Sequence, residues 1–250
     1  MDTIPHKTIR ETFNSIEAGT ADTGVVPVEN SIEGSVYETY DMLLTSSVKV
    51  AGEIVLRVVH CLIGLPGSKI TDIKAVYSHP QALAQCRGFI ASLPIEPIVT
   101  YDTAGSVKMI KEKRLRDAAA IASQKASELY GMDVLAKGIE DYGRNYTRFF
   151  IISMNEAKRT KDSKTSLIFS VPHTPGSLYK ALEAFTRRGI NLTKIESRPT
   201  RQRPWEYYFF LDFEGHRQDR DCARVLRELA TKSVLLKVLG SYPKSKTELT

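Results

Sequence analysis

Hydrophobic positions in the first part of the chain alternate between two spacings. Residues 25–28 form a short apolar run typical of a buried strand, and apolar residues then recur at helical spacing at Val36, Tyr40, Leu43 and Leu44. Residues 75–77 and 118–122 predict two more strands, each followed by a helix. Pro80 suits the first helical position, and residues 123–130 form the later helix. This alternation predicts an α/β domain with mostly parallel strands.

A second, more regular pattern occupies the rest of the chain. Leu167, Phe169 and Val171 recur at every second position, which is the spacing of a strand. A helix is predicted after Pro175, and Gly189 ends it. The remaining elements are two strands, a helix and a strand, at residues 191–200, 207–213, 222–229 and 235–238. The order βαββαβ predicts a ferredoxin-like fold.

Composition places the chain among ordinary globular proteins, with 42% hydrophobic and 26% charged residues in 250. No apolar run reaches the roughly 18 residues of a membrane span, and residues 1–14 lack the apolar core of a secretory signal, so neither membrane insertion nor secretion is expected. Cys61, Cys86 and Cys222 lie far apart. Their spacing argues against a disulfide framework or a zinc site and favours reduced thiols in a cytoplasmic protein.

The formal net charge of +6 raises the question of nucleic-acid binding. Basic residues are mostly interleaved with acids, however, so an anionic small molecule explains the sign equally well. We therefore predict no nucleic-acid partner. The densest basic run, at residues 158–164, is interpreted as a solvated linker.

Three polar clusters are candidates for chemistry, and the first follows the strand at residues 25–28. A helix N-terminus offers free backbone N–H groups and a favourable dipole to an anion. If the chain turns from strand to helix here, Asn30 and Ser31 can add side-chain hydrogen bonds. The alternative is an ordinary helix cap provided by Ser31 or Ser35.

The second cluster begins at Ser78, at the mouth of the next predicted helix. Gln81 and Gln85 are four residues apart and share a helix face. If that face lines a cleft, two amides and a hydroxyl converge there. The alternative is helix capping beside a solvated glutamine pair, and His79 is interpreted as a structural hydrogen-bonding residue rather than a general base.

The third cluster, Asn145 to Arg148, leads into Phe149 and an apolar strand. An arginine can grip a carboxylate with two hydrogen bonds. Thr147 can donate a proton or a hydrogen bond to a leaving oxygen, provided that the site is preorganised and poor in water. The alternative is a surface threonine–arginine pair at the start of a strand.

In the βαββαβ region, Gly176 permits close backbone approach at a strand-to-helix turn. Residues 196–198, Glu-Ser-Arg, end the following strand. Together the two segments could hold both charged ends of an amino acid. The alternative is plain turn chemistry.

Taken in order, these motifs resemble those of the prephenate dehydratase family. Residues 24–36 resemble its first long motif, residues 77–86 its second, and residues 145–149 its threonine–arginine–phenylalanine signature. Residues 176–178 and 196–199 resemble the phenylalanine-binding motifs of its ACT regulatory domain. The resemblance extends over nearly the whole chain.

The resemblance implies a two-lobed catalytic domain at residues 1–153, like the type 2 periplasmic binding proteins, with the substrate in the cleft between the lobes. It implies a linker at 154–165, an ACT domain at 166–243 and a tail at 244–250. The implied reaction converts prephenate to phenylpyruvate, water and carbon dioxide without a metal or cofactor. Formation of the aromatic ring drives it, so the enzyme need only orient a dianion and help the hydroxyl leave.

The resemblance also implies roles for single residues. Thr147 supplies the catalytic hydroxyl. The substrate is positioned by Asn30, Ser78, Gln85 and Arg148, with support from Glu29, Ser31, Gln81, Asn145 and Phe149. L-phenylalanine, as a feedback inhibitor, is implied to bind a homodimer or homotetramer at Gly176, Ser177, Leu178, Glu196, Ser197 and Arg198.

Members of the family open with a strand and a glycine-rich turn that we do not find here, so we expect an N-terminally truncated catalytic domain. Two alternatives stay open. One is a catalytically impaired relative that still binds phenylalanine. The other is an arogenate dehydratase, because arogenate differs from prephenate only in the side chain that the site must accept.

Overall fold

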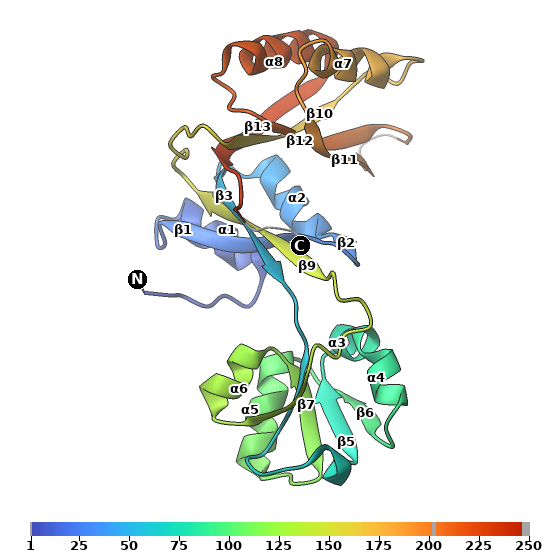
Figure 1. The fold of residues 1–250 in the computed structure, drawn as a ribbon. Helices are drawn as coiled ribbons and strands as arrows, with labels where there is room; N and C mark the ends of the chain where they lie inside the picture. The colour runs from blue at the N-terminus through green and yellow to red at the C-terminus, as the bar shows by residue number, and fades with distance from the viewer. Residues whose placement is uncertain (1, 202–203, 247–250) are drawn as a thin grey trace. The chain divides into compact units, whose positions relative to one another are not determined.

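The computed structural model describes residues 2–201 and 204–246 (Figure 1). The predicted tail at 244–250 therefore lies partly outside the described residues. The chain forms two compact units, the first made of Met1–Leu56 with Thr147–Thr250 and the second of Arg57–Tyr146. The second unit is thus inserted between two segments of the first, and the chain crosses between the units twice.

The first unit begins with a four-stranded sheet in the order β2-β1-β9-β3. Its elements are α1 (Ile9–Glu17), β1 (Thr23–Asn30), β2 (Gly34–Ser35), α2 (Tyr37–Thr45), β3 (Lys49–Arg57) and β9 (Tyr146–Ser153). Strand β1 is antiparallel to both β2 and β9. The strand predicted at 25–28 and the helix predicted after it are therefore confirmed.

The rest of the first unit is the predicted βαββαβ domain. It comprises β10 (Ser163–Ser170), α7 (Ser177–Thr186), β11 (Leu192–Pro199), β12 (Tyr207–Glu214), α8 (Arg220–Lys232) and β13 (Leu235–Pro243). These strands form an antiparallel sheet in the order β11-β12-β10-β13. Because β10 begins at Ser163 and Lys164 is buried, the expectation that the basic run lies wholly in a solvated linker was wrong.

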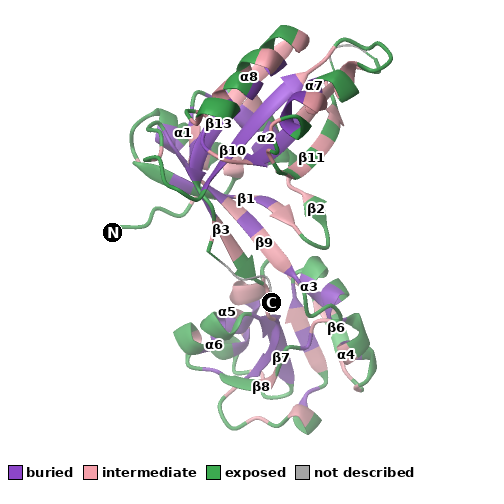
Figure 2. Ribbon diagram, turned by 45° about the horizontal axis from the view of Figure 1, so that its top comes forward, coloured by how far each residue is buried: buried purple, intermediate pink, exposed green. Residues whose placement is uncertain are grey.

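The two faces of this second sheet pack against different partners. Leu167, Leu211 and Phe213 pack with helices α7 and α8. Their strand neighbours Ile168 and Phe210 belong instead to a core shared with the first sheet and with α1 and α2. Strand β10 is buried along nearly its whole length as a result (Figure 2). One face of the βαββαβ domain thus shares a hydrophobic core with the first sheet.

The two sheets approach each other closely at Gly240 in β13. A Cβ atom built on Gly240 would lie 2.1 Å from the backbone oxygen of Val50 in β3. We expect Gly240→Ala to lower the free energy of unfolding by about 1–3 kcal/mol, because a strand must move to admit the methyl group. Urea unfolding followed by circular dichroism would measure this. Gly143→Ala is the matched control, since its nearest neighbour atom would be 3.9 Å away; equal effects of both would contradict the close approach.

The second unit is a five-stranded sheet in the order β6-β5-β7-β4-β8 with helices on it. Its elements are β4 (Cys61–Gly64), η1 (Ile70–Asp72), β5 (Ala75–Ser78), α3 (Pro80–Gln85), α4 (Arg87–Ala91), β6 (Glu96–Val99), α5 (Thr103–Lys113), β7 (Ala118–Ala122), α6 (Gln124–Tyr130) and β8 (Asp133–Lys137). The strands predicted at 75–77 and 118–122 are confirmed, and Pro80 is the first residue of α3.

Strand direction differs from the prediction. Strand β5 is parallel to β6 and β7, but β4 is antiparallel to β7 and β8. Together with the antiparallel pairs of β1, this makes the sheets mixed rather than mostly parallel. The local apolar pattern predicts that a strand is buried, but its direction depends on the connections. Among the residues that the structure describes, no helix is long and apolar enough to cross a bilayer.

Candidate active site

The pairing of β1 with β9 brings two of the sequence motifs together. Asn30 lies opposite Thr147, and Glu29 lies opposite Arg148. The register shifts between Pro27 and Glu29, which makes Val28 the extra residue of a β-bulge. Bulges re-aim side chains. Without this bulge the pairing would move by one residue, and Glu29 rather than Asn30 would lie opposite Thr147.

Asn30 fixes the hydroxyl of Thr147. Its side-chain oxygen accepts hydrogen bonds from the backbone N–H groups of Ile32 and Glu33, at 2.9 and 3.0 Å. This settles the orientation of the amide, so its NH₂ group is the donor to Thr147 Oγ1 at 3.0 Å. A hydroxyl that accepts in this way keeps its own proton to donate elsewhere. The pair therefore has the arrangement that a hydrogen-bond donor to a leaving oxygen requires.

Arg148 has a different environment from the one expected. Its Nε donates to Glu53 at 2.7 Å, and its two terminal nitrogens donate to Asp212 at 2.6 Å and to the hydroxyl of Tyr242 at 3.0 Å. The side chain is buried and faces the second sheet, whereas Thr147 faces the other way. The three described hydrogen bonds of Arg148 all go to protein groups, and its direct grip on a substrate carboxylate stays a prediction.

Arg148 lies in a cluster of charges of both signs. Glu53 also binds Lys164, with Nζ 3.1 Å from Oε2, and Glu29 lies 3.7 Å from Arg148. Burial alone would lower the pKa of Arg148, but the neighbouring Asp212 and Glu53 outweigh it, and the pKa is raised above its usual value. For Tyr242, whose charged form is the phenolate, burial raises the pKa far above its usual value. Arg148 therefore stays charged and Tyr242 neutral.

The first motif forms a hairpin rather than the expected strand-to-helix turn. Residues 31–33 are a turn, and Gly34–Ser35 pairs back on β1 as β2. Helix α2 begins only at Tyr37, and its N-cap residue, Val36, makes no side-chain cap. Ser31 is exposed on the turn, so it does not cap the helix as the alternative interpretation expected. Phe149 lies half-buried opposite Pro27, on the same face of the sheet as Thr147.

The second unit holds the remaining predicted residues in a buried polar network. Gln85 Oε1 accepts from Asn145 Nδ2 at 3.1 Å and lies 2.9 Å from His60 Nε2. All three side chains are buried. Sequence reasoning did not include His60, and no local signal singles it out, because its partners Gln85 and Glu140 lie 25 and 80 positions away.

Ser78 and Gln81 do not join this network through any contact described. Ser78 is fully buried and donates to the backbone oxygen of Ile121 at 2.6 Å. Gln81 is exposed, whereas Gln85 on the same short helix is buried. The backbone N–H of Gln81 donates to His79 Nδ1. His79 is therefore the N-cap of α3, as expected of a structural hydrogen-bonding residue.

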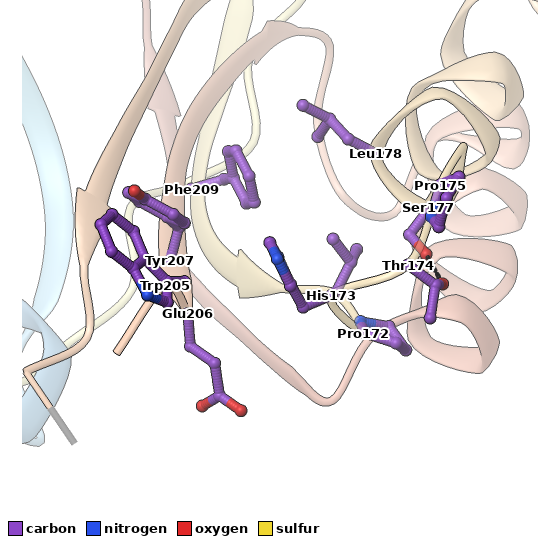
Figure 3. A pocket seen from close by; sticks show the side chains of 11 residues that line it. Pro172, His173, Thr174, Pro175, Ser177, Leu178, Trp205, Glu206, Tyr207 and Phe209 are labelled. Carbon is purple, nitrogen blue, oxygen red and sulfur yellow. Dashed lines mark hydrogen bonds between the residues drawn. The ribbon is translucent and has the colours of Figure 1, made fainter. Parts of the chain in front are cut away.

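The βαββαβ domain contains a cavity of about 340 Å³. Figure 3 shows the side chains around it, which come from the turn before α7, from α7 and from the start of β12. Ser177 and Leu178 line it, as do His173, Tyr207 and Phe209. Gly176 lies at the N-cap of α7 with a φ of 79°, a conformation that favours glycine. The cavity has mostly apolar walls and a few polar groups, as small-molecule sites do.

The second predicted phenylalanine segment is not in the lining of this cavity, but Ser197 is the register partner of Phe209, which lines it. Glu196 binds Lys194 and Ser35, and Arg198 donates to the backbone oxygen of Tyr37 and to Asp41, so both contact the region around α2. Ser197 lies between them and is exposed. Burial opposes ionisation of Glu196, but hydrogen bonds from Ser35 and Lys194 outweigh it and lower the pKa of that carboxyl.

Models of two known protein families match this chain. A model of the prephenate dehydratase family matches residues 1–157, and a model of the ACT domain matches residues 165–231. The chain belongs to the prephenate dehydratase family. The two-lobed α/β catalytic portion and the βαββαβ regulatory portion are therefore a prephenate dehydratase domain and an ACT domain, as the motifs had indicated.

Curated relatives carry several activities. The chain is 46% identical over 96% of its length to a bifunctional chorismate mutase/prephenate dehydratase of Aquifex aeolicus, of which it covers 66%. It is 40% identical over 99% of its length to arogenate dehydratase/prephenate dehydratase 2 of Arabidopsis thaliana, of which it covers 68%. The chain thus spans about two thirds of the length of these relatives.

Solved structures show the same fold. The prephenate dehydratase of Arthrobacter aurescens in complex with L-Phe has a TM-score of 0.87 at 32% identity, covering 98% of this chain and 82% of that one. A structure described as GqqA, a quorum quenching acylase, has a TM-score of 0.87 at 36% identity, with coverage of 97% and 89%. The ACT domain and the Asn30–Thr147 strand pair therefore lie in a fold shared by proteins of differing chemistry.

Proposed function

We propose that the protein converts prephenate to phenylpyruvate, water and carbon dioxide in the synthesis of phenylalanine. The observation that carries the proposal is the hydrogen bond that orients Thr147 through Asn30, within a chain of the prephenate dehydratase family. The reaction breaks two bonds of the substrate ring. The C–O bond to the ring hydroxyl and the C–C bond to the ring carboxylate both break, and the electrons of the latter complete the aromatic ring.

The proposed role of Thr147 follows from the proton balance. The leaving hydroxyl needs one proton to become water, and the carboxylate leaves as carbon dioxide without one. Thr147 donates a hydrogen bond to the leaving oxygen, and the proton taken up comes finally from solvent. Because a threonine hydroxyl is a weak acid, the effect is largely electrostatic and needs a fixed donor, which the Asn30 amide supplies. Asn30 thus acts as a positioning residue.

The other predicted site residues are proposed to have different roles. Gln85 and Asn145 hold each other and His60, which favours an indirect role in keeping the second unit's polar groups in place. The Ser78 hydroxyl donates its proton to the backbone oxygen of Ile121, so towards a substrate it can only accept a hydrogen bond. Arg148 is proposed to act through the strand that it anchors.

The experiment is an assay of phenylpyruvate formation by the purified chain, with prephenate and arogenate supplied in parallel. The expected result is turnover of prephenate with the higher kcat/KM. The relatives include arogenate dehydratases of Petunia hybrida at 39% and 40% identity, so faster turnover of arogenate would overturn the substrate assignment. Absence of turnover with both substrates, despite retained phenylalanine binding, would favour the impaired relative.

We also propose that L-phenylalanine inhibits the enzyme by binding the ACT cavity. Ser177 and Leu178 line that cavity, and a similar prephenate dehydratase was solved with L-Phe. Titration calorimetry is expected to show binding in the unmodified chain and its loss in Ser177→Trp, whose ring fills the cavity. Tyr179→Trp is the matched control, since Tyr179 is 70% exposed and lies outside the lining. Equal affinity of both variants would rule out the cavity.

A homodimer or homotetramer is the proposed assembly, because β11 and β13 are edge strands of the ACT sheet and such edges commonly pair. Light scattering on the full chain is expected to give two or four times the mass of 28.0 kDa. A monomer at working concentration would contradict it.

The thiols support a reducing, cytoplasmic location. Cys61, Cys86 and Cys222 are free and buried, and burial raises the pKa of Cys86 to about 12 and that of Cys222 to about 11. Thiolates are the reactive form. We therefore expect DTNB at pH 8 to modify less than about one thiol per native chain within minutes, and all 3 cysteines after denaturation. Rapid labelling of the native chain would contradict this burial.

A further inference from the structure

A row of polar residues crosses the ACT sheet on the face that meets the first sheet. Lys194 on β11 is the register partner of Asp212 on β12, and Asp212 is the register partner of Ser166 on β10. Ser166 donates to Asp212 and also contacts the hydroxyl of Tyr242. Apolar neighbours such as Ile168 and Phe210 share this face, so the row is a polar strip within a hydrophobic contact.

This strip meets a charge pair of the catalytic strands. Lys194 Nζ lies 2.8 Å from Glu29 Oε1, and Asp212 Oδ2 lies 2.6 Å from a terminal nitrogen of Arg148. Glu29 and Arg148 are themselves register partners, with 3.7 Å between their charged atoms. The four residues therefore form a chain of alternating charges from Lys194 through Glu29 and Arg148 to Asp212, and Lys194 also binds Glu196 at 3.0 Å.

Each charge of the catalytic strands adjoins a member of the proposed catalytic pair. Glu29 precedes Asn30, and Arg148 follows Thr147. Successive strand residues point to opposite faces, so the charge pair faces the ACT sheet while Asn30 and Thr147 face away from it. A displacement of either charge moves the backbone that carries the adjacent catalytic side chain.

Stability alone does not account for this strip. Removing charges from water costs free energy that their attraction often only balances, so apolar residues would hold the two sheets together as well. The Lys194 side chain is 9% exposed and that of Asp212 5%. Buried charges at fixed partners specify one register between two surfaces, and here the register sets the positions of Asn30 and Thr147.

We infer that Lys194 and Asp212 are positioning residues for the dehydration reaction: from the ACT sheet, through Glu29 and Arg148, they hold the Asn30–Thr147 pair in its reactive geometry. The inference rests on the proposed function, since it takes that pair to be the catalytic one. The ACT domain is then part of the catalytic apparatus as well as the domain to which phenylalanine binding is assigned.

The test compares Lys194→Met and Asp212→Asn with the unmodified chain. We expect kcat for prephenate to fall about 10-fold or more with KM changed less than about 3-fold, because small misplacements of reacting groups cost rate rather than binding. Lys194→Arg, which keeps the charge, should restore most of kcat. Lys232→Met is the matched control, since Lys232 binds Glu228 on the helical side of the ACT domain; it should leave kcat unchanged.

A double-mutant cycle separates positioning from general damage. If Lys194 acts through Glu29, then adding Lys194→Met to Glu29→Gln should lower kcat no further, because coupled residues are not additive. Fully additive losses, or an unchanged kcat in folded Lys194→Met, would overturn the inference. Should Asp212→Asn fail to fold, Lys194→Met still decides, because its partner Glu29 is 33% exposed and tolerates the change more easily.

A second readout does not depend on turnover. The side-chain amide NMR signal of Asn30 should shift in Lys194→Met but stay in place in Lys232→Met. An unmodified chain that forms no phenylpyruvate would refute the proposed function alone, and the Asn30 signal would still test the inference. An Asn30 signal that is the same in both variants would refute the inference even if the enzyme is active.

Discussion

Thr147→Ala is expected to lower kcat for phenylpyruvate formation by about 10²- to 10³-fold, the range seen when one preorganised donor to a developing charge is removed. The alanine keeps the strand and its register with Asn30, so substrate binding should change little. KM is therefore expected to stay within a few-fold of its original value, which marks a loss confined to the transition state. Steady-state kinetics with prephenate measure both constants.

Two further variants test the geometry of that pair. Thr147→Ser keeps the hydroxyl and should retain most of kcat. Asn30→Ala leaves the hydroxyl without the amide that orients it at 3.0 Å, so an intermediate loss is expected. If Thr147→Ala kept more than half of the original kcat, Thr147 would have no place in the mechanism.

Arg148→Met is expected to lower the free energy of unfolding by about 3–5 kcal/mol, since removing one member of a buried ion pair leaves the other charges buried without their partner. Asp212 would keep only Ser166 as a described partner, and Glu53 would keep Lys164. The methionine is of similar length, so lost volume contributes little. Urea unfolding of the full chain, followed by circular dichroism, measures the change.

The control for this variant is Arg187→Met. Arg187 also binds carboxylates, but its side chain is 54% exposed, and an exposed pair contributes at most about 1 kcal/mol. The double variant Arg148→Met with Asp212→Asn should recover part of the lost stability, because one unpaired charge is gone. If Arg148→Met lowered the free energy of unfolding no more than Arg187→Met, the buried charges would not depend on Arg148 as a partner.

Local sequence patterns predicted the βαββαβ elements and, in the catalytic part, the strands β1, β5 and β7 with the helices after them, but they did not single out α1, β3, β4, β6, α5 or β8. Burial of a strand or of one helix face determines the spacing of apolar residues along the chain, as in residues 118–122, which are all buried. The βαββαβ order needed only such local signals. The helix after Pro80 shows their limit: apolar residues continue to Ile90, yet α3 ends at Gln85 and a new helix begins at Arg87.

The parts of the site that could not be predicted depend on distant partners. Asp212 binds Arg148 across 64 positions of sequence, and His60 reaches Gln85 across 25. The bulge at Val28 decides which side chain faces Thr147, and it is visible only in the register of two paired strands. The motif around Arg148 thus predicted that an arginine was important, but not that its partners are protein carboxylates.

The insertion of Arg57–Tyr146 between two segments of the first unit also bears on how the protein is made. On the ribosome, the inserted unit emerges as one continuous stretch and can fold before the C-terminal segment has been synthesised. The sheet that carries Asn30 lacks β9 until translation passes Ser153, and the core that it shares with β13 waits until Pro243. Strands β1 and β3 therefore leave the exit tunnel before β9, the strand that lies between them, has been made, and their apolar residues stay exposed until then.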